Sequence, residues 1–140
     1  MATPVTLTTE LGLPFGPAVP FANGGAANVT ATSGNAANAI ATATLPAVAA
    51  KTTYITGFDV TGSGATAGLP VVVTVAGLLG GSMTYTYSAA VGALVANTPL
   101  SIRFPVALPS SAVNTAITVT CPALGIGATN NVINAFGFSA

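Results

Sequence analysis

The sequence is poor in the residues that carry most enzyme chemistry. Its 140 residues include no histidine, no tryptophan and one cysteine. Charged residues make up 3% of the chain, against about 25% in an ordinary soluble domain. General acid–base catalysis draws mainly on histidine, carboxylates and lysine, and this chain offers Glu10, Asp59 and Lys51. We therefore expect that the protein is not an enzyme.

The single cysteine, Cys121, excludes an intramolecular disulfide and a cysteine–histidine metal centre. A cysteine nucleophile needs a histidine or another cation beside it. Because histidine is absent, the sequence predicts that Cys121 is a buried and inert thiol. No cofactor and no metal are expected.

The net charge is zero, and Lys51 and Arg103 are the two basic residues. Binding to nucleic acid depends on basic side chains that neutralise phosphates, so no nucleic-acid partner is expected. Hydrophobic residues make up 51% of the chain. The densest apolar stretch, residues 69–79, is nevertheless interrupted by proline, threonine and glycine, and it is shorter than the roughly 20 residues of a membrane span. No membrane partner is expected.

The first residues contain no basic group and no continuous apolar core. This predicts a protein made in a cytoplasm without a signal peptide. A nearly uncharged surface is also poorly suited to a free monomer. We therefore expect much of the surface to lie against other subunits.

Residues 1–36 differ from the rest of the chain in holding four prolines and a Gly/Asn/Ala-rich run. Proline disfavours both a central strand and a helix, yet apolar residues recur. An extended arm that docks on a neighbouring subunit fits both facts, as does an edge strand folded back on its own domain; a disordered tail is a third interpretation. If the arm docks on a partner, the expected contact residues are Val5, Leu7, Leu11, Leu13 and Phe15.

Residues 37–140 are expected to form one β-sandwich domain. Runs of β-branched and aromatic residues with a period of two predict short strands, separated by turn residues. The link at residues 78–81 predicts a hairpin. The best helix candidate, residues 36–50, is weakened by its threonines and Pro46. The strands predicted from these runs cover residues 40–45, 53–60, 70–75, 82–87, 100–104, 116–120 and 132–138.

Asp59 and Arg103 lie in two of these predicted strands, each between apolar neighbours. A cross-strand ion pair with a structural role is the simplest expectation for them. The tyrosines Tyr54, Tyr85 and Tyr87 could form an exposed stacking surface for a glycan, or they could belong to the core. Threonine-rich strands could order water or bind carbohydrate, although threonine is also an ordinary uncharged residue for an exposed sheet face.

Four segments resemble small all-β structural proteins of tailed-bacteriophage virions. They are residues 53–66 (TYITGFDVTGSGAT), 99–105 (PLSIRFP), 114–119 (NTAITV) and 130–138 (NNVINAFGF). The resemblance covers residues 50–140 and implies a capsid decoration (cement) or head-fibre protein. Such proteins sit on the shell as oligomers, often trimers, and have no active site to transfer.

The sequence thus predicts an all-β protein, a β-sandwich or jelly roll of about 7–8 short antiparallel strands, with an extended N-terminal arm. Its expected role is that of a virion structural protein that forms homo-oligomers, with trimers favoured. It would attach to or stabilise the major capsid protein, or another virion protein, through apolar and β-edge contacts. The alternative is a carbohydrate- or receptor-binding module of a phage fibre or tail.

Overall fold

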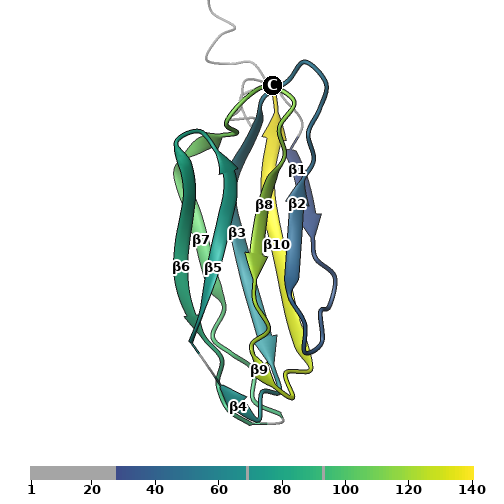
Figure 1. Cartoon of the computed structure of the whole chain (residues 1–140), viewed down its shortest axis with the longest axis vertical. Coiled ribbons are helices and arrows are strands. Elements are labelled where there is room, and N and C mark those ends of the chain that lie inside the picture. The colour runs from purple at the N-terminus through teal and green to yellow at the C-terminus, as the bar shows by residue number, and fades with distance from the viewer. Residues whose placement is uncertain (1–27, 69, 93) are drawn as a thin grey trace, which may run out of the picture.

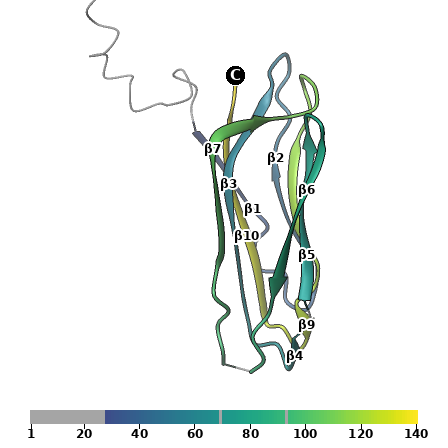
Figure 2. The same ribbon diagram turned by 90° about the vertical axis from the view of Figure 1, so that its left-hand side faces the viewer.

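The computed structural model describes residues 28–68, 70–92 and 94–140. These residues form two four-stranded antiparallel sheets that pack face to face, so the predicted all-β sandwich is confirmed. Figures 1 and 2 show the two layers from the front and from the side. In the described ranges, no helix long and apolar enough to cross a membrane occurs.

The strand order in each sheet follows from the antiparallel pairings. The first sheet has the order β1 (Asn28–Thr32), β10 (Asn130–Ser139), β3 (Thr53–Ser63) and β7 (Leu100–Pro109). The second sheet has the order β2 (Ala41–Leu45), β8 (Ile117–Cys121), β5 (Pro70–Leu78) and β6 (Gly81–Ser88). A two-residue pairing joins β4 (Ala67–Gly68) to β9 (Gly125–Ile126).

All seven strands expected from the sequence are present, as β2, β3, β5, β6, β7, β8 and β10. The predicted hairpin is also confirmed, because Leu78 pairs with Gly81 across the turn between β5 and β6. Gly80 and Gly81 have φ angles of 94° and 123°. These left-handed conformations favour glycine, which has no Cβ to clash with the backbone.

Strand β1 comes from the segment that the sequence analysis placed in the arm. It pairs with β10 along its whole length, from Asn28 opposite Phe138 to Thr32 opposite Asn134. The end of that segment is therefore an edge strand of the sandwich. The predicted partner-contact residues lie outside the described residues: Val5, Leu7, Leu11, Leu13 and Phe15.

The core lies between the sheets and follows the two-residue period of the strands. In β2, the side chains of Ala41, Ala43 and Leu45 are buried while Thr42 and Thr44 are exposed. The largest fully buried side chain is Phe58, whose ring meets Tyr85 edge to face at 5.4 Å. Other core side chains include Ile55, Val60, Val73, Val75, Ile117, Val119 and Ile133.

Both ends of the described fold lie at the same end of the sandwich. Figure 1 shows the start of β1, the end of β10 and the β5–β6 turn there, with β4 and β9 at the opposite end. The backbone of Ala140 exchanges two hydrogen bonds with Thr52, at 3.1 and 2.8 Å, which fixes the C-terminus beside the start of β3. Residues 1–27 therefore join the sandwich at the end that carries the β5–β6 turn.

Candidate functional site

The described residues hold three charged side chains, and two of them neutralise each other. Arg103 Nη2 lies 2.9 Å from Asp59 Oδ2, and Nη1 lies 3.0 Å from Oδ1, so the pair is bidentate. The ion pair expected from the sequence is confirmed. Lys51 is exposed in the loop before β3.

The Arg103 side chain crosses three strands. Gly57 of β3 pairs with Arg103 of β7 on one side and with Phe136 of β10 on the other. A Cβ atom on Gly57 would lie 2.8 Å from Arg103 Cδ. Because glycine leaves that space open, the Arg103 guanidinium reaches over β3 and lies 4.7 Å from the centre of the Phe136 ring.

The hydrogen bonds of this cluster are satisfied within the protein. Arg103 Nη1 also donates to the carbonyl oxygens of Ile102 and Phe58, at 2.9 and 3.2 Å. Ser101 donates to Asp59 Oδ1. The hydrogen bond from Arg103 holds the pKa of Asp59 below its usual value, and partial burial opposes that shift. The cluster therefore clamps β7 to β3, and its geometry is that of a structural ion pair.

Cys121 is fully buried at the end of β8. Burial raises the pKa of its thiol to about 11. A thiol with such a pKa is almost entirely protonated at neutral pH and is a poor nucleophile. This agrees with the inert thiol expected from the sequence. Within residues 28–68, 70–92 and 94–140, no group of three or more His, Cys, Asp or Glu side chains could hold a metal ion.

The three tyrosine rings take part in packing. Tyr87 is 6% exposed, Tyr85 packs on Phe58 in the core, and Tyr54 stacks on Phe138 with ring centres 4.8 Å apart. Tyr54 and Tyr85 are half-buried. No observation favours the exposed aromatic platform that the glycan-binding alternative requires, and that alternative stays a prediction.

The outer face of the second sheet carries a row of threonines across all four strands. Thr120 of β8 pairs with Thr42 of β2 and with Thr74 of β5, and Thr74 pairs with Thr84 of β6. The hydroxyls of Thr42 and Thr120 lie 3.5 Å apart. The composition shows that threonine is frequent, but the row depends on the strand register. It gives this face hydroxyl and methyl groups and no charge.

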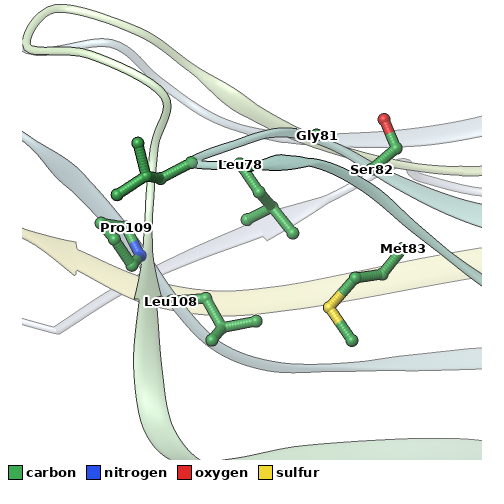
Figure 3. A pocket seen from close by; sticks show the side chains of 8 residues that line it. Leu78, Gly81, Ser82, Met83, Leu108 and Pro109 are labelled. Carbon is green, nitrogen blue, oxygen red and sulfur yellow. The ribbon is translucent and has the colours of Figure 1, made fainter.

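An apolar groove opens between the β5–β6 turn and the end of β7. It has a volume of about 170 Å³. Figure 3 shows the side chains of Leu78, Met83 and Leu108 pointing into a common space, while the Ser82 hydroxyl points away. This groove could not be predicted from the sequence, because its walls come from strands that are distant in the chain.

The groove lies where the end of β7 meets the β5–β6 turn. Leu78 forms a β-bridge with Ser110, and the backbone N–H of Leu79 donates to the carbonyl oxygen of Pro109 at 2.9 Å. Residues 104–107 of β7 have no partner on β3, since Arg103 pairs with Gly57 and the next paired residue, Leu108, is opposite Ile55. In β6, the side chains that face the core are more exposed near the β5–β6 turn than at the other end of the strand. Tyr87 is 6% exposed, and Met83, next to the turn, is 38% exposed. The apolar rim also includes Leu79, which is 67% exposed.

Strand β6 is the outermost strand of the second sheet beside this groove. In the part of the chain that the structure describes, it pairs with β5 alone. Natural edge strands are commonly protected by proline, charge or short length. The eight residues of β6 include no proline and no charged residue, whereas β7 carries Pro105, Pro109 and Arg103 and the edge strands β1 and β2 have five residues each. Strand β6 is thus the least protected long edge.

Comparison of the chain with known protein families, curated proteins and solved structures finds no match. The fold defines a β-sandwich, and the features of its surface are the groove, the free β6 edge and the threonine row.

Proposed function

We propose that the protein is a non-enzymatic structural protein of a virion, which self-associates and attaches to or stabilises the capsid. The observation that carries this proposal is the uncharged and partly apolar character of the exposed surface. Within the described ranges, Arg103 and Asp59 are paired, which leaves Lys51 as the unpaired charged side chain. A surface of this kind favours burial against other proteins over a free monomeric state.

Large apolar side chains are exposed at both ends of the sandwich. Near the β5–β6 turn, Leu79 is 67% exposed, and Val106 on the unpaired part of β7 is 73% exposed. At the opposite end, Ile126 of β9 is 75% exposed and Leu94 is 99% exposed. Apolar side chains on a surface with so little charge are the ordinary basis of protein–protein contact. Two apolar ends suit a subunit that contacts neighbours in more than one direction.

A shell with many equivalent copies suits contacts of this type. Each 100 Å² of apolar surface removed from water contributes about 2.5 kcal/mol before the cost of association. In a symmetric shell, the same favourable free energy is gained at every equivalent contact. The resemblance of residues 50–140 to virion structural proteins is the reason for proposing a capsid as the assembly.

The first test is the association state of the purified full chain. Sedimentation velocity should show an oligomer whose association strengthens in sulfate, because that salt favours apolar burial. Contacts made by ion pairs would weaken as salt is added. A monodisperse monomer at high concentration in both conditions would contradict the proposal.

The second test addresses location. Antibody labelling and electron microscopy of particles from cells that make the protein should place it on the particle surface at symmetric positions. If the protein self-associates but is missing from purified particles, the virion role is wrong and only the proposed self-association stands.

A further inference from the structure

We propose that the groove beside β6 receives the N-terminal segment, residues 5–15, of a second copy of this chain. The segment would lie as an added strand along the free β6 edge, with alternate side chains in the groove. This inference rests on the proposed function, because it requires the copies to associate. It goes further by assigning the site that accepts the segment.

The sequence of the segment matches that site. Its apolar residues all occupy odd positions, and successive side chains of a strand point to opposite faces. An extended segment would therefore present one face that is apolar except for Thr9. Its other face would hold Thr6, Thr8, Glu10, Gly12 and Pro14. The residues on the apolar face are Val5, Leu7, Leu11, Leu13 and Phe15.

The acceptor site offers what such a strand needs. The outer edge of β6 provides backbone hydrogen-bonding groups, which are the usual source of affinity when a strand is added to a sheet. Beside that edge, Leu78, Met83 and Leu108 line the groove. A strand paired with β6 would direct every second side chain between the two sheets, where these three residues lie. The added strand would also cover the side chain of Met83, which is 38% exposed.

The point where residues 1–27 join the fold places the segment within reach. Strand β1 begins at the end of the sandwich that holds the groove (Figure 1). Residues 16–27 can span roughly 40 Å when extended, and the four strands of one sheet are about 14 Å wide. The segment can therefore reach well beyond its own domain.

Two prolines in this connection favour a second copy over the same one. Pro17 and Pro20 fix φ near the extended polyproline value. An extended connection favours a neighbouring copy, whereas filling its own groove would require the chain to turn back at Gly24 and Gly25. Exchange of segments would then link each copy to a neighbour.

The first experiment blocks the site in the full chain. Met83→Lys places a charge in the groove, and Leu79→Lys places one on its rim at a more exposed position that tolerates substitution. Each should weaken self-association by at least about tenfold, because the bound strand would bury an unpaired charge. Deleting residues 1–22 should have a similar effect, and combining the deletion with Met83→Lys should add little. The matched control is Val72→Lys, since Val72 is 50% exposed on the outer face of the same sheet.

Sedimentation velocity measures the association, and circular dichroism checks that each variant keeps its β structure. Weakening by both groove variants and not by the control would support the inference. Unchanged association in the folded Leu79→Lys and Met83→Lys variants would overturn it.

The second experiment determines which copy donates the segment. Differently tagged copies carrying Leu11→Cys or Met83→Cys are mixed and oxidised mildly, and the native Cys121 stays buried. A disulfide that joins the two differently tagged copies supports exchange. A second sample carries both Leu11→Cys and Met83→Cys in one chain. If its disulfide forms only within each chain, exchange is overturned. If no link forms in a protein that is still oligomeric, the acceptor site is wrong and the proposed function stands. If the unmodified chain is a monomer, the proposed function and this inference both fail.

Discussion

The guanidinium of Arg103 lies over the ring of Phe136, two strands away across the first sheet. The intervening residue is Gly57, so the contact depends on a position without a side chain. One arginine thus links β7, β3 and β10 by combining a ring contact with an ion pair.

We expect Arg103→Lys to destabilise the fold by about 1 kcal/mol. Lysine cannot form the bidentate pair with Asp59, and its ammonium stacks less well on Phe136. Both charged side chains are partly solvated, with Arg103 56% exposed, so a larger effect is not expected. Urea denaturation measures the change. A double-mutant cycle with Asp59→Asn should give a coupling energy well below 2 kcal/mol, and no coupling would contradict the structural role.

Acidification should destabilise the protein through Asp59. The pKa of Asp59 is lowered from its usual 3.8 in the folded state, mainly by the hydrogen bond from Arg103. A depressed pKa stabilises the folded state above the unfolded pKa, and this contribution is lost as the pH falls through the folded pKa. Stability should therefore decline below about pH 4. Asp59→Asn should flatten this part of the profile; an unchanged acid limb would contradict the assignment.

Alkaline pH should destabilise the protein through Cys121. Its pKa is raised from 9.0 to about 11 by burial, so the unfolded chain loses the thiol proton first. Stability should fall between pH 9 and 11 by up to about 2–3 kcal/mol. Cys121→Ala has its own effect on packing at neutral pH, but it should reduce the slope in this interval. Thermal melts at several pH values test this, and an identical slope in both proteins would contradict it.

Gly137→Ala should be among the more damaging small substitutions. A Cβ at Gly137 would lie 2.1 Å from the backbone oxygen of Tyr54 and 2.8 Å from Leu45 Cδ1. Backbone cannot yield as a flexible side chain does, so we expect a loss of about 2–3 kcal/mol. Gly34→Ala is the control. It has a φ of 63° but nothing within 4 Å, and it should cost about 1 kcal/mol. Equal effects of the two substitutions would contradict the packing explanation.

Seven strands could be predicted because their side chains alternate with a two-residue period that is visible in the local sequence. Strand β1 was not separated from the arm, because its short run NVTAT follows a Gly/Asn/Ala-rich stretch. The pairing of β4 with β9 involves two residues from each strand, which is too little for a local signal.

The candidate site was predicted only in part. The Asp59–Arg103 pair could be predicted because the chain has so few charges. The threonine row depends on strand register. The groove depends on how the β5–β6 turn packs against Leu108 and Pro109 at the end of β7, and a sequence does not reveal such long-range relations. Asn131 was also missed: it is fully buried, and its side chain donates to the carbonyl oxygens of Ala39 and Pro122, at 3.1 Å each.

The placement of Ala140 next to Thr52 has a practical consequence. A label attached at Ala140 would emerge at the same end as the groove and the start of β1, where it would compete with the proposed subunit contacts. A foreign loop inserted near Leu94 would instead lie at the opposite end of the sandwich, away from the groove. Insertions at the two ends of the sandwich therefore test the two proposed apolar contact surfaces separately.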